Sequence, residues 1–132
     1  MKIFDCFMFF DEEMLLDIRL NIMSKYVDKF VITESTYMHS GKPKKLQFDI
    51  NKYSKFKDKI IYNVVDRMPT NLEKINDNDD QITRGHKLIN NSVKRENLQR
   101  EFALNSLINA EDEDIILIND IDEIPNLNNI NF

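Results

Sequence analysis

The chain has 132 residues, of which 42% are hydrophobic and 31% charged, and its formal net charge is −5. This length fits one domain, residues 1–132, with a core that needs no disulfide or metal. The acidic balance argues against a nucleic-acid-binding protein, because phosphate contacts require a dominant basic surface.

The sequence lacks a run of about 18 apolar residues and the features of a signal peptide. We therefore expect no membrane segment in this chain and, for the chain as given, a cytoplasmic location. Cys6 is the single cysteine, which rules out an internal disulfide. It is expected to be a buried structural thiol in a reducing compartment, and no catalytic cysteine is implied.

The first half of the chain predicts, in order, a strand (2–9), a helix opening at Asp11, a strand (27–34), a loop (35–46), a short helix (51–57) and a strand (59–65). The strands are rich in β-branched and aromatic side chains. In the first helix, Leu15, Ile18 and Ile22 follow one another at helical spacing, so we expect this stripe to pack on a sheet.

The second half predicts a long polar loop (66–80), a helix (82–110) and a fourth strand (114–119). In this helix we expect Leu98, Phe102, Leu107 and Ile108 to face the core. The fourth strand is a short Ile-rich run that ends in charged residues, a pattern typical of a strand buried on both faces of a parallel sheet. The arginines at 19 and 100 are expected more often in surface ion pairs than on a ligand.

This alternation predicts an α/β fold with a mainly parallel sheet flanked by helices and joined by right-handed crossovers, as in a Rossmann-like nucleotide-binding half. The chain ends soon after its acidic cluster, so we expect an incomplete domain. Ligands of such sheets bind outside the carboxyl ends of the strands.

Three acids, Asp120, Asp122 and Glu123, follow the fourth strand directly. If the backbone stays extended, Asp120 and Asp122 point to the same side. Two carboxylates so placed suit Mn²⁺ or Mg²⁺, which can also bind the phosphates of a substrate. The alternative for this pair is a solvated or helix-capping role.

Two other enzyme or metal-binding classes also use acids at this spacing. A haloacid-dehalogenase-like phosphohydrolase would have Thr or Val after the second Asp, where this chain has Glu123. An EF-hand would need a Gly that is missing here, and Pro125 would disrupt its loop. A truncated, non-catalytic sugar-nucleotide-binding domain is the non-enzyme alternative.

Four segments resemble glycosyltransferase family seventeen, whose members include the β-1,4-mannosyl-glycoprotein 4-β-N-acetylglucosaminyltransferase. They are residues 5–21 (DCFMFFDEEMLLDIRLN), 31–35 (VITES) with 39–44 (HSGKPK), 96–100 (ENLQR) and 120–125 (DIDEIP). Their order and spacing match the family over nearly the whole chain. One departure is Asn119, where the family more often has Ser.

The resemblance implies a GT-A-like fold and inverting transfer of a sugar such as N-acetylglucosamine from a UDP-sugar donor to a glycan acceptor, with Mn²⁺ or Mg²⁺. It places Asp120 and Asp122 at the metal and donor, with Glu123 extending the motif. The family's second half is expected to carry the general base, so no catalytic residue is assigned here. Eukaryotic members of the family are Golgi membrane proteins.

Two more residues are expected near the donor by the same resemblance. Glu34 would contact the nucleoside, the alternative being an acid that simply ends a strand. Arg100 would bind phosphate or sugar through its planar guanidinium. For Glu123 the alternative is a cap on the following turn. His39 has no partner at metal-ligand spacing and is expected to be an ordinary loop histidine.

Overall fold

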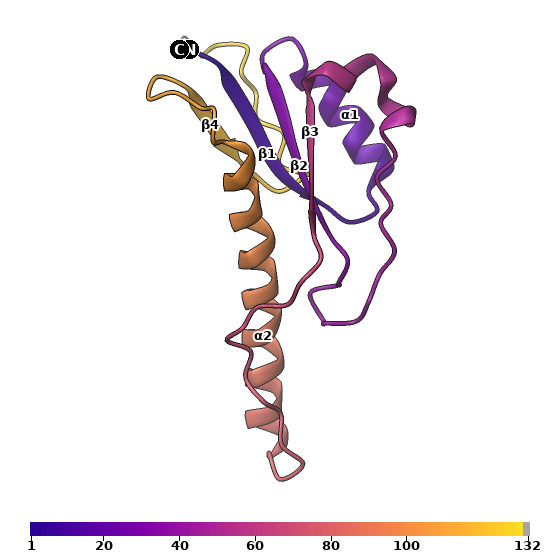
Figure 1. Cartoon of the computed structure of the whole chain (residues 1–132), viewed down its shortest axis with the longest axis vertical. Coiled ribbons are helices and arrows are strands. Elements are labelled where there is room, and N and C mark those ends of the chain that lie inside the picture. The colour runs from indigo at the N-terminus through magenta and orange to yellow at the C-terminus, as the bar shows by residue number, and fades with distance from the viewer. Residues whose placement is uncertain (131–132) are drawn as a thin grey trace.

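The computed structural model describes residues 1–130 and contains one parallel sheet with helices on both faces. The elements are β1 (Ile3–Phe9), α1 (Glu13–Met23), β2 (Lys29–Ser35), the 3₁₀ segment η1 (Ile50–Lys59), β3 (Ile60–Val65), α2 (Gln81–Phe102), the 3₁₀ turn η2 (Ala103–Ser106) and β4 (Ile115–Ile118). The strand order is β3-β2-β1-β4, with every neighbouring pair parallel. The predicted α/β fold is confirmed (Figure 1).

The side chains of β1 and β2 alternate between two cores, one on each face of the sheet. Phe7 of β1 and Phe30 and Ile32 of β2 pack with α1 and η1 on one face. Cys6 and Val31 pack with η2 on the other face. Because both faces of these two central strands are covered, they are buried along almost their whole length.

The buried stripe of α1 is not the one expected. Leu16 and Leu20 are fully buried, whereas Ile18 and Ile22 are 41% and 45% exposed. Of the expected stripe, Ile18 and Ile22 are therefore wrong, whereas Leu15 packs against the core with part of its side chain exposed. Apolar residues on this helix offer two adjacent faces, and the buried one is the face that carries Arg19, which is also fully buried.

Two expectations for the second half are wrong. The long helix ends at Phe102 instead of 110, and a 3₁₀ turn follows, so the helical spacing is lost and Ile108 is 85% exposed. Leu107 still packs against the core, as expected. β4 lies at the edge of the described sheet, and its Ile118 is 59% exposed, so this strand is not buried on both faces.

Residues 66–80 contain no helix or strand, as predicted, and they run alongside α2, which extends well beyond the sheet (Figure 1). The Asn91 side chain pairs with the backbone of Glu73 through two hydrogen bonds, of 2.7 and 2.9 Å. The Asp80 carboxylate caps the start of the helix by accepting from the amide of Thr83. Among residues 1–130, the helices are too short or too polar to cross a membrane.

Cys6 is buried in the middle of β1, as expected for a structural thiol. Burial, and next the charge of Asp5, raise the pKa of this thiol from 9.0 to about 12. Because the thiolate is the reactive form, Cys6 is protonated and unreactive in the folded protein.

The shifted face of α1 can be tested with two substitutions on the same helix. Leu20→Ala is expected to lower the free energy of unfolding by about 2–5 kcal/mol, because it leaves a cavity in the core. Ile18→Ala should stay within about 0.5 kcal/mol of wild type. Urea denaturation measures both. A larger loss for Ile18→Ala would show that the expected stripe is the buried one.

The buried thiol predicts a loss of stability at alkaline pH. Above pH 9.0 the unfolded chain loses the Cys6 proton, whereas the folded state keeps it until about pH 12. Stability should therefore fall as pH rises between these values, by up to about 1.4 kcal/mol per pH unit. Urea denaturation of wild type and Cys6→Ala over this pH range measures the effect. In Cys6→Ala, the decrease in unfolding free energy that comes from the thiol should be absent. Equal slopes in both proteins would contradict the assignment.

Candidate active site

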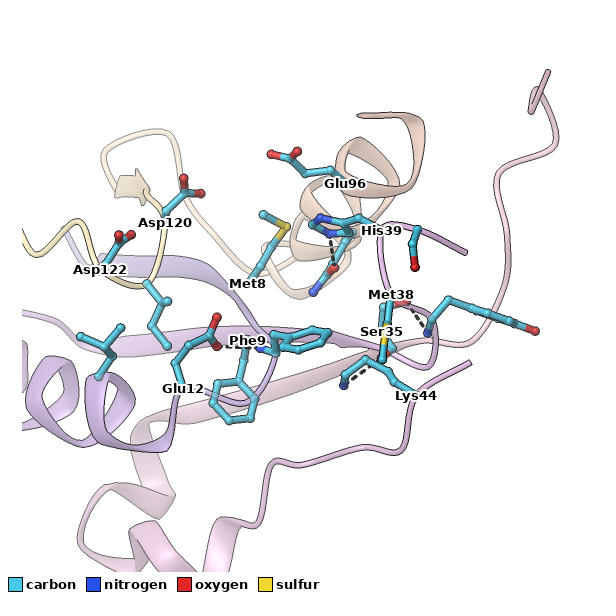
Figure 2. A pocket seen from close by; sticks show the side chains of 16 residues that line it. Met8, Phe9, Glu12, Ser35, Met38, His39, Lys44, Glu96, Asp120 and Asp122 are labelled. Atoms are coloured by element: carbon cyan, nitrogen blue, oxygen red, sulfur yellow. Dashed lines mark hydrogen bonds between the residues drawn. The ribbon is translucent and has the colours of Figure 1, made fainter. Parts of the chain in front are cut away.

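An open pocket of about 710 Å³ lies at the carboxyl ends of β1, β2 and β4. Its lining comes from the ends of β1 and β2, the start of α1, the loop after β2, α2 and the turn after β4 (Figure 2). The lining residues are Met8, Phe9, Phe10, Glu12, Leu15, Ser35, Tyr37, Met38, His39, Ser40, Lys44, Glu96, Gln99, Asp120, Ile121 and Asp122. Of the expected site residues, Asp120 and Asp122 line this pocket.

The acids after β4 lie in a turn. The amide of Glu123 donates to the carbonyl oxygen of Asp120 at 3.0 Å, and the Glu123 carboxylate accepts from the amide of Asp120 at 3.0 Å. The extended backbone assumed for 120–122 is therefore wrong, yet both aspartates line one pocket because the turn presents them together. In this structure Glu123 caps the turn.

Arg19 binds the backbone of this turn from the protein interior. It forms a buried ion pair, not the surface ion pair that was expected. Its Nε and Nη2 donate to the two carboxylate oxygens of Asp5 at 2.9 and 2.7 Å, and both side chains are fully buried. Its Nη1 donates to the backbone oxygens of Asp120, Ile121 and Glu123 at 2.9, 3.1 and 2.9 Å. A signal was present in the sequence: Asp5 interrupts a hydrophobic strand, and only a buried partner allows that.

Arg100 lies on the opposite side of the acidic turn. Its Nη2 donates to Asp120 Oδ1 at 2.7 Å and to Glu96 Oε1 at 2.9 Å, and the Asp120 side chain is 48% exposed. The hydrogen bonds that Arg100 donates to Glu96, and then to Asp120, raise its pKa. Asp120 is thus already paired with a cation, whereas its neighbour Asp122 is exposed at the pocket.

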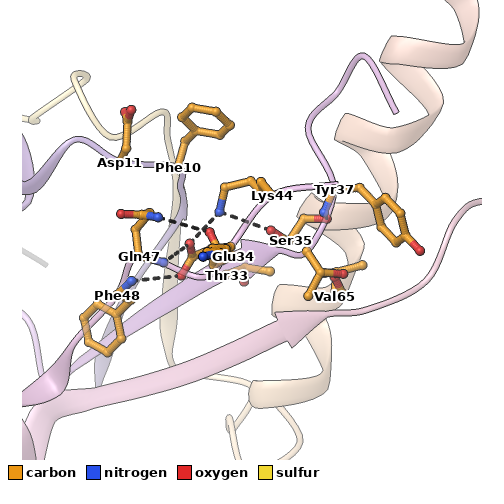
Figure 3. Close-up of polar contacts among 12 residues, drawn as sticks. Phe10, Asp11, Thr33, Glu34, Ser35, Tyr37, Lys44, Gln47, Phe48 and Val65 are labelled. Carbon is orange, nitrogen blue, oxygen red and sulfur yellow. Dashed lines mark hydrogen bonds and ion pairs between the residues drawn. The ribbon is translucent and has the colours of Figure 1, made fainter. Parts of the chain in front are cut away.

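Glu34 is fully buried at the end of β2, outside the pocket lining. Its carboxylate accepts from the ammonium of Lys44 at 2.6 Å and from the amides of Gln47 and Phe48 at 2.6 and 3.1 Å (Figure 3). It also accepts from the hydroxyl of Tyr62 at 2.7 Å. Burial, and next the bond to Glu34, raise the pKa of the tyrosine well above its usual value. Glu34 therefore anchors the loop after β2, and its contact with a nucleoside stays a prediction.

The loop after β2 brings further polar groups to the pocket. Lys44 lies with its ammonium 5.2 Å from the centre of the Phe10 ring. Gly41 has φ +92°, and a Cβ there would meet the Arg95 guanidinium at 2.7 Å, so the turn requires glycine. Arg95 in turn donates to the backbone oxygen of His39 at 2.9 Å, which fastens the loop to α2.

His39 is part of the pocket wall, which its loop position in the sequence did not reveal. Its Nε2 lies 3.2 Å from Oε1 of Gln99, whose Nε2 donates to the backbone oxygen of Thr33 at 2.8 Å. A carbonyl can only accept, so the Gln99 amide must turn its oxygen toward the imidazole. His39 then donates from Nε2 to this oxygen.

The pocket offers a hard cation two carboxylate ligands, Asp120 and Asp122. Among the described residues, no group of three or more His, Cys, Asp or Glu side chains is placed to hold a metal. Asp120 and Asp122 together offer carboxylate oxygens at one pocket. Mg²⁺ and Mn²⁺ fit such a pair, because these ions keep waters and complete their shell with substrate phosphates.

The anchoring role of Glu34 can be tested by Glu34→Gln. An amide has one acceptor oxygen for the four donors and turns N–H groups toward them, so we expect a loss of about 3 kcal/mol in unfolding free energy. Glu13→Gln is the matched control, because Glu13 pairs with Lys52 at the surface and should change stability by less than about 1 kcal/mol. Urea denaturation measures both, and similar values would contradict the buried anchor.

Comparison with curated proteins and with solved structures finds no match for this chain. The family model of glycosyltransferase family 17 matches residues 1–132, the whole chain. The same family was indicated by the segments around Asp5, Glu34, Arg100 and Asp120. The chain belongs to glycosyltransferase family 17.

Proposed function

We propose that this chain binds a UDP-sugar together with Mn²⁺ or Mg²⁺ in the pocket at the carboxyl ends of β1, β2 and β4, and that the sugar, N-acetylglucosamine, is transferred to a glycan acceptor. The observation that supports this most is the turn after β4, which brings Asp120 and Asp122 to the wall of the same pocket. Membership of a glycosyltransferase family makes a sugar donor the natural ligand.

The strand order supports an orientation for the donor. β1 lies between β4 and β2, so a diphosphate beside Asp122 lies at one end of the pocket. One of the two groups that the diphosphate joins, the nucleoside or the sugar, then extends across the end of β1, toward Phe10 and Tyr37. Aromatic faces of this kind suit a nucleobase or the apolar side of a sugar.

The charged side chains of the pocket fit a departing diphosphate. A bound divalent ion would offset the negative charge that develops on the leaving UDP. Asp120 and Asp122 would hold that ion, whereas the ammonium of Lys44, which also lines the pocket, is already paired with Glu34. When Asp120 binds the ion, Arg100 loses part of its pairing and can donate to a phosphate oxygen.

The inverting course expected for the family requires a base that removes the proton of the acceptor hydroxyl. We assign no catalytic residue within this chain. The competing function is binding of the sugar nucleotide without turnover, which the same pocket would allow. Family membership favours sugar transfer over the phosphohydrolase alternative.

Calorimetry with UDP-N-acetylglucosamine tests the proposal directly. We expect binding that requires Mn²⁺ or Mg²⁺, and Asp122→Ala should weaken it at least about tenfold, which corresponds to about 1.4 kcal/mol. Asp112→Ala is the matched control, because it removes the same charge from the exposed turn before β4, at the opposite end of that strand. Binding that is independent of metal, or equally strong in Asp122→Ala and wild type, would refute the proposed site.

A further inference from the structure

We propose that Arg19 is a positioning residue for the sugar donor: it holds the backbone of residues 120–123 so that the carboxylates of Asp120 and Asp122 face the pocket. The inference rests on the function proposed above. It concerns a side chain that does not line the pocket itself and acts through the acidic turn.

All three nitrogens of the Arg19 guanidinium donate hydrogen bonds. A guanidinium has five N–H groups in one plane. Nε and Nη2 bind the two oxygens of Asp5, and Nη1 reaches the backbone oxygens of Asp120, Ile121 and Glu123. Nη1 has two hydrogens for these three acceptors, so one hydrogen is shared.

Asp5 determines where Arg19 points. The carboxylate binds one edge of the guanidinium, Nε and Nη2, through two hydrogen bonds, which fixes the plane of the group and directs Nη1 to the turn. The face of the Phe7 ring lies 4.7 Å from the guanidinium carbon and closes one side. Both charges are fully buried, so neither group can exchange its partner for bulk water.

The turn depends on this side chain because its backbone oxygens point inward. Three carbonyls from 120–123 converge on one nitrogen, and buried carbonyls without a donor are costly. With these oxygens directed to Arg19, the carboxylates of Asp120 and Asp122 lie on the pocket side (Figure 2). A lysine at position 19 would keep the charge, but one ammonium cannot span Asp5 and the turn together.

The experiment compares wild type, Arg19→Lys and Met23→Ala. Met23 is fully buried in the last turn of α1, so its substitution destabilises the same helix without removing a hydrogen bond to the acidic turn. Two quantities are measured: Mn²⁺-dependent binding of UDP by calorimetry, and hydrogen exchange of the amides of Asp120 and Glu123 relative to amides in β1 and β2. Urea denaturation confirms that each variant is folded.

We expect Arg19→Lys to weaken Mn²⁺-dependent UDP binding at least tenfold and to accelerate exchange in the turn at least tenfold relative to the strands. Met23→Ala should leave both quantities close to wild type, although it lowers stability. Unchanged binding and exchange in Arg19→Lys, or the same losses in Met23→Ala, would overturn the inference. If Arg19→Lys does not fold, Asp5→Asn, which leaves the guanidinium in place but removes its charged partner, should show the same changes to a smaller degree.

The two proposals fail in different ways. If wild type binds no UDP in the presence of Mn²⁺, the proposed donor site is refuted, and with it the role of Arg19 in donor binding. The exchange measurement still decides whether Arg19 holds the turn. If wild type binds but Arg19→Lys binds equally well, only the role of Arg19 is lost.

Discussion

The buried ion pair between Asp5 and Arg19 is the interaction on which the site depends. Burying two charges is expensive, and it is tolerated here because the pair is bidentate and the remaining donors bind backbone oxygens. The pair joins β1, α1 and the turn after β4, which are far apart in the sequence. Arg19 lies on the buried face of α1, together with Leu16 and Leu20.

A second buried carboxylate repeats this arrangement on the neighbouring strand. Glu34 at the end of β2 anchors the following loop through Lys44 and two backbone amides, as Asp5 anchors the acidic turn through Arg19. Two segments that line the pocket, the loop after β2 and the acidic turn, are thus each held in place by a buried acid of a central strand. Loops carry function best when a rigid scaffold positions them, and here the scaffold does so with charge as well as with apolar packing.

The acidic turn combines a fixed backbone with carboxylates that stay accessible. Arg19 uses only the backbone oxygens of Asp120, Ile121 and Glu123, so the aspartate side chains remain available to a ligand. Arg100 neutralises part of Asp120, which reduces repulsion between the two aspartates. Accessible carboxylates on a fixed backbone suit the pocket of a glycosyltransferase, the family to which this chain belongs.

The sequence alone determined the α/β alternation, the parallel sheet and the place of Asp120 and Asp122, because these follow from local hydrophobic patterns and the rule that ligands gather at strand ends. The resemblance of its segments to family 17 indicated the enzyme class. Only the tertiary structure decided the buried face of α1, the edge position of β4 and the tasks of Arg19 and Glu34. Two adjacent apolar faces on a helix look alike in sequence, and the partner of a buried charge can lie about a hundred residues away, as the backbone of the acidic turn does from Arg19.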